Sequence, residues 1–234
     1  MIVPLITAIV PAAGVGSRMQ ADRPKQYLLL NGKTVLEHTV EQLLAHPKIG
    51  QVVIAISQQD PYFSSLSLAS HPRVKVVNGG NERADSVMNA LRLVDEQQLG
   101  EWVMVHDAAR PCVTERDISQ LIQRALSHPV GAILASPVRD TMKRGDGDGN
   151  IVQTVERQAL WHALTPQMFR CQPLLQALQQ ALAQHAIITD EASAFEWQGA
   201  YPALVSGRAD NIKITQPEDL ALAEFYVSQK KETA

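Results

Sequence analysis

The chain has 234 residues, of which 45% are hydrophobic and 19% charged, so it can bury a large core without disulfides or metal clips. A formal net charge of −3 excludes the basic excess typical of a dedicated nucleic-acid binder, so an anionic ligand must be held by a local cluster of cations. The two cysteines, Cys112 and Cys171, match no metal or redox spacing, and no apolar run approaches 18 residues. The apolar start lacks the basic residues of a secretion signal before Arg18, so we expect a cytoplasmic protein that does not enter a membrane.

Strands and helices alternate along most of the chain. Short runs rich in β-branched residues are apolar throughout, which is typical of strands buried on both faces of a parallel sheet: Leu5–Val10, Gln51–Ile56, Val74–Val77, Trp102–Val105 and Gly131–Ala135. Helical patterns fall between them at Val35–Leu44, Ser86–Val94 and Glu115–Leu126. This order predicts an α/β fold with an open, doubly wound, mostly parallel sheet in a single domain over residues 1–234.

The stretch from Pro137 to Gln167 breaks the alternation. A Gly-Asp-Gly-Asp-Gly-Asn run followed by Ile151–Val155 predicts a β-hairpin with a mobile tip, forming an arm at about 137–160. The acids of the tip do not make a calcium loop, because the required later Gly and Glu are Ile151 and Arg157. The remaining predicted elements are a helix near Gln172–Gln184, one opened by Thr189-Asp190-Glu191, a strand near Ala203–Val205, and a final helix with a Thr215/Glu218 capping box.

A Gly-rich loop follows the first strand, at Pro11-Ala12-Ala13-Gly14-Val15-Gly16-Ser17-Arg18-Met19. Such a loop exposes backbone N–H groups that can face a phosphate. It is not a dinucleotide fingerprint, because Met19 replaces the third Gly and Pro24 interrupts the helix that should follow. Nor is Gly32-Lys33-Thr34 a Walker loop, because Tyr27 stands where the first Gly is required, and Asn31-Gly32 is better interpreted as a tight turn.

Cations stand at fixed distances behind this loop. Arg18 and Lys25 are placed to meet charge that grows on phosphorus and on departing pyrophosphate, while backbone donors hold a triphosphate. The pattern therefore predicts nucleotidyl transfer rather than hydride transfer or hydrolysis by an activated Ser or Cys, for which no Gly-x-Ser-x-Gly or Cys–His arrangement is present.

Further candidate residues follow the third and fourth strands. Gly79 and Gly80 would let a flat base approach the backbone, and Asp85 or Ser86 would cap the next helix. Asp107 is placed for a sugar hydroxyl or a magnesium ion and Arg110 for a phosphate, because ligands of open α/β sheets bind beyond the carboxyl ends of strands. His106 alone is better interpreted as a hydrogen-bonded structural residue, and no His pair has zinc spacing.

Near the C-terminus, Lys213 interrupts what we interpret as an apolar strand. A strand Lys that points inward must meet an anion, whereas an outward Lys needs no partner, and the pattern leaves both orientations open.

These motifs together resemble those of bacterial 2-C-methyl-D-erythritol 4-phosphate cytidylyltransferases of the non-mevalonate isoprenoid pathway. The resemblance covers nearly the whole chain. It rests on Pro11-Ala-Ala-Gly-x-Gly-x-Arg-Met, Pro24-Lys-Gln-Tyr, Gly79-Gly-x-Glu-Arg-x-Asp-Ser-Val, Val105-His-Asp-Ala-Ala-Arg-Pro, Pro137-Val-x-Asp-Thr-Met-Lys, Leu160-Trp-x3-Thr-Pro-Gln, Thr189-Asp-Glu and Asn211-Ile-Lys. One departure is Glu156, where the family pattern has Asp before the Arg.

The resemblance implies a Rossmann-like nucleotidyltransferase in which the phosphate of methylerythritol phosphate attacks the α-phosphorus of magnesium-bound CTP. The implied catalytic residues are Arg18, Lys25, Arg157 and Lys213. The implied nucleotide contacts are Ala12, Ala13, Gly14, Gly16, Gly80, Ser86 and Asp107. The implied contacts with the acceptor substrate are Asp107, Arg110, Thr141, Arg157, Thr165, Thr189 and Lys213. It also implies a homodimer joined through the hairpin arm, and a magnesium ion held mainly by the CTP phosphates.

The chemistry agrees with this resemblance, because a phosphate dianion is already a nucleophile and needs cations and positioning rather than a general base. Two alternatives stay open from the sequence. One is a cytidylyltransferase for another polyol phosphate, such as ribitol 5-phosphate, which would share the nucleotide half. The other is a non-catalytic nucleotide-binding regulator, against which the Arg18 and Lys25 pair argues.

Overall fold

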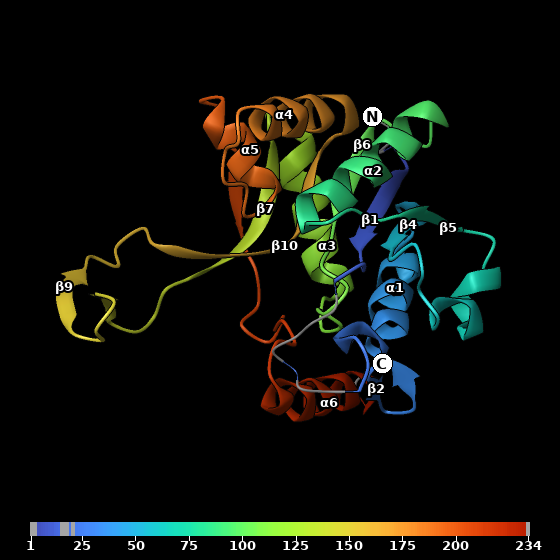
Figure 1. Ribbon diagram of the computed structural model, residues 1–234, viewed down its shortest axis with the longest axis horizontal. Coiled ribbons are helices and arrows are strands. Elements are labelled where there is room, and N and C mark those ends of the chain that lie inside the picture. The colour runs from blue at the N-terminus through green and yellow to red at the C-terminus, as the bar shows by residue number, and fades with distance from the viewer. Residues whose placement is uncertain (1–3, 15–18, 20–21, 233–234) are drawn as a thin grey trace.

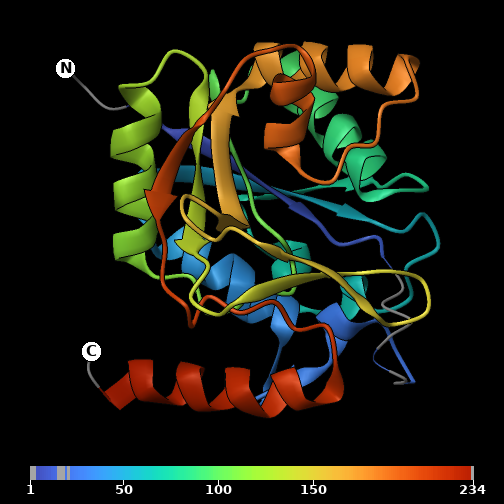
Figure 2. The same ribbon diagram turned by 90° about the vertical axis from the view of Figure 1, so that its left-hand side faces the viewer.

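The computed structural model describes residues 4–14, 19 and 22–232. Its centre is a seven-stranded sheet in the order β11-β7-β10-β6-β1-β4-β5, with helices on both faces (Figures 1 and 2). The strands are β1 (Ile6–Pro11), β4 (Ile49–Ile56), β5 (Val74–Asn78), β6 (Trp102–Val105), β7 (Gly131–Pro137), β10 (Trp161–Arg170) and β11 (Ala203–Ser206). The predicted doubly wound, mostly parallel α/β fold is confirmed.

Alternate residues of the central strand β6 enter two different cores, which explains why this strand has no polar position. In β6, Trp102 and Met104 pack in a core with α1 (Val35–Ala45) and α3 (Glu115–Leu126). Val103 and Val105 face the other core, which is built by three helices: α2 (Arg83–Glu96), α4 (Cys171–Ala183) and α5 (Glu191–Trp197). Successive side chains of a strand point to opposite faces of the sheet. Where helices cover both faces, side chains on both faces are therefore buried.

Strand β10 was not predicted from the sequence. It lies between β6 and β7 and runs antiparallel to both, with Gln167 opposite Val105 and Ile133. Since β10 runs against its neighbours, its first half reaches the edge of the sheet where β6 ends. The strand therefore carries Thr165 and Gln167 to the same edge as the loops after β1, β5 and β6.

Small elements complete the chain. The turn at Asn31-Gly32 joins β2 (Leu29–Leu30) to β3 (Lys33–Thr34), with both turn residues at positive φ, as predicted. Single 3₁₀ turns lie at Lys25–Tyr27 (η2), Phe63–Ser65 (η3) and Ser67–Ser70 (η4). The C-terminal helix α6 (Pro217–Glu232) packs with β2 and with Met19 in a third, smaller core (Figure 1).

The hairpin forms as expected, from β8 (Met142–Gly145) and β9 (Ile151–Val155), and it projects from the body of the molecule (Figure 1). Its side chains Ile151 and Val152 are mostly exposed. Among the residues that the structure describes, no helix is both long and apolar enough to cross a membrane.

Three local predictions are wrong. The segment from Asn211 to Thr215 is irregular rather than a strand. Helix α6 is capped by Asp219, whose carboxylate accepts from the N–H groups of Thr215 and Gln216 at 2.8 and 2.9 Å, instead of by Glu218. Helix α2 begins three residues before the prediction, although Asp85 does cap it, from inside the first turn, by accepting from the Glu82 N–H at 3.0 Å.

Candidate active site

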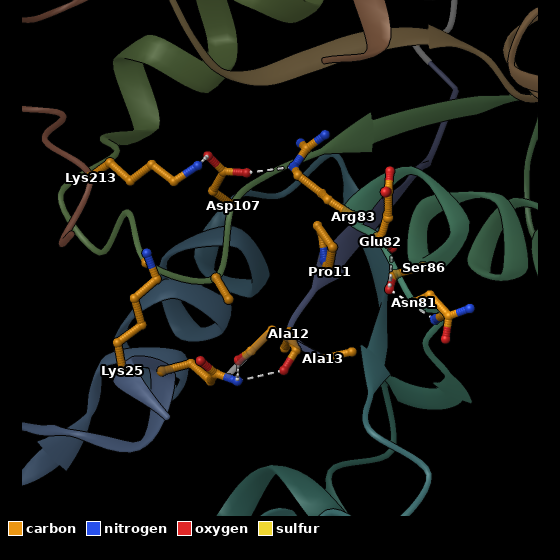
Figure 3. A pocket seen from close by; sticks show the side chains of 15 residues that line it. Pro11, Ala12, Ala13, Lys25, Asn81, Glu82, Arg83, Ser86, Asp107 and Lys213 are labelled. Atoms are coloured by element: carbon orange, nitrogen blue, oxygen red, sulfur yellow. Dashed lines mark hydrogen bonds and ion pairs between the residues drawn. The ribbon is translucent and has the colours of Figure 1, made fainter. Parts of the chain in front are cut away.

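A cavity of about 180 Å³ opens at the carboxyl ends of β1, β5 and β6, the edge at which open α/β sheets bind ligands (Figure 3). The loop after β1 contributes one wall, and the start of α2 contributes the opposite one. Its lining residues are Pro11, Ala12, Ala13, Gly14, Lys25, Gln26, Gly80, Asn81, Glu82, Arg83, Ser86, Asp107, Ala108, Ala109 and Lys213. Predicted nucleotide residues from three separate parts of the sequence therefore meet in one place.

The two glycines after β5 are required by close packing. A Cβ at Gly79 would lie 2.4 Å from that of Ala13, and a Cβ at Gly80 would lie 2.2 Å from that of Asp85. The Ser86 hydroxyl accepts from the Gly80 N–H at 3.0 Å and donates to the Glu82 carbonyl at 3.2 Å. Ser86 therefore fixes the backbone of the Gly80 loop to the start of α2.

The carboxylate of Asp107 is surrounded by cations. Lys213 Nζ lies 2.8 Å from Oδ2, Arg83 Nε 3.0 Å from Oδ1, and Arg110 Nε 3.4 Å from Oδ2. Burial alone would raise the pKa of Asp107, but Arg83, Lys213 and Arg110 outweigh it and hold that pKa far below its usual range. Asp107 is therefore ionised, and the inward orientation of Lys213 is the one that the structure adopts, from an irregular segment instead of a strand.

Arg83 links this carboxylate to a second one. Its two terminal nitrogens donate to the two oxygens of Glu191 at 2.7 and 3.1 Å. Its Nε donates to Asp107, as Figure 3 shows. Glu191 is 1% exposed, at the start of α5. Burial acts to lower the pKa of Arg83, but the carboxylates of Glu191 and Asp107 raise it above its ordinary value. The bidentate pair thus fixes Arg83 in one orientation.

His106 has the structural role predicted for it. Its Nε2 lies 3.0 Å from the Arg110 carbonyl, which can only accept, so Nε2 carries the proton. Nδ1 then accepts from the Thr165 hydroxyl at 3.0 Å, and the same hydroxyl oxygen accepts from the Asp107 N–H at 3.0 Å. Burial lowers the pKa of His106 to about 4, so the ring is neutral. This chain of bonds fixes the backbone under Asp107.

A second cavity, of about 230 Å³, adjoins the first and shares Arg83, Asp107 and Lys213 with it. Its other lining residues are Arg110, Ala163, Leu164, Thr165, Gln167, Thr189 and Asp190. The predicted acceptor-substrate residues Asp107, Arg110, Thr165, Thr189 and Lys213 are thus gathered here. Arg110 is largely committed within the protein, because Nη1 also donates to the Asn211 carbonyl at 2.7 Å.

Other predicted residues lie elsewhere. Thr141 and Arg157 are exposed at the base of the hairpin, where Arg157 donates to the Arg139 carbonyl, and neither lines the two cavities described above. Gly16 and Arg18 fall outside the described residues.

Three functional residues had no predicted role: Gln26, Arg83 and Glu191. All three belong to motifs that the sequence shows, but no local pattern indicates their partners. Arg83 and Glu191, for example, are 108 residues apart.

Comparison with known proteins agrees with this geometry. A family model described as 2-C-methyl-D-erythritol 4-phosphate cytidylyltransferase matches residues 6–229. The chain is 72% identical to a protein of that name from Vibrio cholerae, over 97% of this chain and 98% of the relative. It is also similar to a crystal structure of 4-diphosphocytidyl-2C-methyl-D-erythritol synthase, with a TM-score of 0.83 and 37% identity over 96% of this chain and 99% of the other. A Francisella tularensis 2-C-methyl-D-erythritol 4-phosphate cytidylyltransferase gives a TM-score of 0.81 and 37% identity, over 95% of this chain and 99% of the other.

Proposed function

The chain belongs to the 2-C-methyl-D-erythritol 4-phosphate cytidylyltransferase family, and from this premise we propose how its residues divide the work of cytidylyl transfer. The reaction joins CTP and methylerythritol phosphate to give 4-diphosphocytidyl-2-C-methyl-D-erythritol and pyrophosphate, a step of isoprenoid biosynthesis. The acceptor phosphate oxygen forms a bond to the α-phosphorus while the bond between that phosphorus and the bridging oxygen of pyrophosphate breaks. A different polyol phosphate as acceptor is not favoured by these relatives.

One observation supports the division of roles most strongly: the two adjoining cavities share the wall formed by Arg83, Asp107 and Lys213. CTP occupies the cavity of the Gly-rich loop, with its base near Ala13, Gly80 and Ser86 and its ribose near Asp107. Methylerythritol phosphate occupies the second cavity, near Thr165, Thr189 and Arg110. The shared wall then lies where the acceptor phosphate meets the α-phosphorus, as in-line transfer requires.

In this arrangement Lys25 and Arg18 stabilise charge that develops on the nucleotide phosphates, and Lys213 positions the attacking phosphate. In the substrate-free protein, Lys213 is paired with Asp107 at 2.8 Å. An incoming phosphate would compete with that carboxylate for the ammonium group, and Arg83 and Arg110 would keep Asp107 compensated when Lys213 turns to the substrate.

Magnesium, or another divalent cation, enters with the triphosphate in this proposal. The described residues contain no group of three or more His, Cys, Asp or Glu side chains that could hold a metal ion, and the Asp107 carboxylate is already occupied by three cations. The residues present therefore fit a metal carried mainly by phosphate oxygens, which is how Mg²⁺ is commonly bound beside nucleotides. Such an ion would neutralise charge on the triphosphate.

We propose that Thr141 and Arg157 act on the active site of a second copy of the chain. Both are exposed on the projecting hairpin and line neither of the two cavities, and the hairpin exposes Ile151 and Val152. A two-stranded hairpin with few apolar residues is stabilised best by packing on a partner, and a two-fold dimer would exchange the two arms.

Subunit complementation tests this exchange. Lys25→Ala and Arg157→Ala are each expected to be nearly inactive, and they are then mixed and allowed to re-form dimers. If Arg157 acts across the interface, each mixed dimer has one intact site, so random mixing restores about a quarter of the wild-type sites. If Arg157 serves its own chain, every site carries one lesion and mixing restores nothing.

We also propose a cytoplasmic location. Both cysteines are buried free thiols, which suits a reducing compartment.

A further inference from the structure

Gln26 is a buried polar residue of the 3₁₀ turn η2, between Lys25 and Tyr27, and it is only 4% exposed. Its side-chain Nε2 donates to two backbone carbonyls of the Gly-rich loop, to Ala12 at 2.6 Å and to Gly14 at 3.0 Å. An amide NH₂ group has two hydrogens, so both are committed to this loop. Replacing the donor would leave the buried carbonyl oxygen of Ala12 and the partly buried one of Gly14 without this hydrogen bond.

These bonds determine which way the peptide after Ala12 faces. A peptide unit is planar and trans, so its N–H points away from its carbonyl oxygen. Because the Ala12 oxygen faces Gln26, the N–H of Ala13 faces the opposite side. Ala13 also lines the nucleotide cavity, at the point where Gly79 packs against it. Gln26 thereby selects the backbone orientation of the loop that the nucleotide meets.

The same turn also carries Lys25. Figure 3 shows Lys25, Ala12 and Ala13 around one side of the cavity. The turn is anchored on its other flank by Tyr27, which is 2% exposed and whose hydroxyl donates to Asp60 Oδ2 at 2.8 Å. The ammonium group of Lys25 donates to the Ile214 carbonyl at 2.8 Å. Gln26 bonds this anchored turn directly to the Gly-rich loop, at Ala12 and Gly14.

We infer that Gln26 is a positioning residue that holds the Gly-rich loop in register with Lys25, so that the cation and the nucleotide cradle act on the same phosphate group. The inference rests on the proposed role of Lys25. Misplacement of a reacting group by about 1 Å can lower a rate roughly a hundredfold, so this register affects turnover more than folding.

The test uses Gln26→Glu, which keeps the shape of the side chain but replaces the NH₂ donor by an acceptor. At pH 8 we expect kcat to fall roughly a hundredfold, with the KM for methylerythritol phosphate within about twofold of wild type. A carboxyl group buried against two carbonyl oxygens has a raised pKa, and its protonated form donates one hydrogen bond. The ratio of variant to wild-type kcat should therefore rise as the pH falls from 8 toward 6.

Gln51→Glu is the matched control. Gln51 lies on β4 at the opposite edge of the sheet, and its Nε2 also has two acceptors, the Leu99 carbonyl at 3.0 Å and Thr7 Oγ1 at 3.2 Å. The same substitution there should lower the melting temperature without changing kcat or its pH profile. Gln26→Met, which removes the donor without adding charge, should lose kcat at every pH and show no recovery. It also serves as the test if Gln26→Glu does not fold.

The result that overturns the inference is a kcat for Gln26→Glu and Gln26→Met within about threefold of wild type at pH 8, accompanied by a lower melting temperature. Gln26 would then only stabilise the fold, as Gln51 does. Lys25→Ala separates this failure from failure of the proposed function. If Lys25→Ala retains its kcat, the role of Lys25 is wrong. If it loses kcat and the Gln26 variants do not, only the positioning inference fails.

Discussion

Removing the charge of Arg83 should destabilise the protein strongly, because it leaves the buried carboxylate of Glu191 without a positive partner. In the native structure the two oxygens of Glu191 each receive one Arg83 N–H, and Glu191 is 1% exposed. Arg83→Met keeps much of the aliphatic stem and removes only the guanidinium. Breaking one side of a buried ion pair costs about 3–5 kcal/mol, since the remaining charge has neither water nor a partner.

For a chain of this size, 1 kcal/mol corresponds to roughly 2–4 °C in melting temperature. Arg83→Met should therefore melt about 10 °C below wild type at pH 8. Asp107 contributes less to this loss, because Lys213 and Arg110 still compensate it. The assay is thermal unfolding followed by circular dichroism, on wild type, both single variants and the Arg83→Met/Glu191→Gln double variant.

The double variant distinguishes this explanation from a simple loss of packing. Glu191→Gln removes the stranded charge, so the double variant should melt several degrees above Arg83→Met alone. The explanation is refuted if Arg83→Met melts within about 2 °C of wild type, or if the double variant melts no higher than Arg83→Met. Either result would mean that the ion pair with Arg83 does not stabilise buried Glu191.

The site makes four other predictions. Lys25→Ala should lower kcat about a hundredfold, equivalent to roughly 3 kcal/mol in the barrier, and an effect confined to the KM for CTP in steady-state kinetics would contradict its transition-state role. CTP should be turned over much faster than UTP in a pyrophosphate-release assay. Backbone carbonyls near Ala13 and Gly80 are expected to accept from the amino group of cytosine, and uracil has a carbonyl in place of that amino group. Equal turnover of the two nucleotides would refute this position of the base. EDTA should abolish turnover but leave the melting temperature of the ligand-free protein unchanged, whereas a fall in that temperature would indicate a metal cage within the protein itself. Burial lowers the pKa of His106 to about 4, so on acidification the unfolded chain protonates this histidine before the folded chain does. About 2 kcal/mol of stability should therefore be lost between pH 7 and 5. A His106→Gln variant should lack that part of the pH dependence of unfolding, and an unchanged profile would contradict the role of His106 in it.

The sheet was predictable where the signal was local. Strands β1, β4, β5, β6 and β7 are short apolar runs, and their order with the intervening helices determines the doubly wound fold. Strand β10 was not predicted, because His162, Thr165 and Gln167 interrupt its apolar pattern. Two of these positions, Thr165 and Gln167, are polar because they lie at the edge of the sheet, where they line the second cavity.

The same distinction applies to the candidate site. The Gly-rich loop, Gly80, Ser86 and Asp107 were predictable because each follows a strand and is a residue type suited to phosphate, base or sugar. The partner of Lys213 was not, because the orientation of a side chain in an irregular segment depends on where Asp107 lies in the folded chain. Gln26 likewise has no signature in its own sequence neighbourhood, since a glutamine next to a lysine is usually a solvated polar residue.

The charges of the assembled site favour contributions from outside the described part of the chain. The lining cations are Lys25, Arg83, Arg110 and Lys213, and the lining acids are Glu82, Asp107 and Asp190, with Glu191 behind Arg83. Four positive and four negative groups leave these side chains balanced, although the reaction brings a triphosphate and a phosphate monoester together. A balanced pocket gives little net attraction for two anions, so further positive charge must accompany them. The candidates are Arg18, a divalent cation bound to the triphosphate, and Arg157 from a neighbouring arm. Among the described residues, the two cavities have no excess of cations, so the exchanged arm proposed above would add charge of the sign that the substrates require.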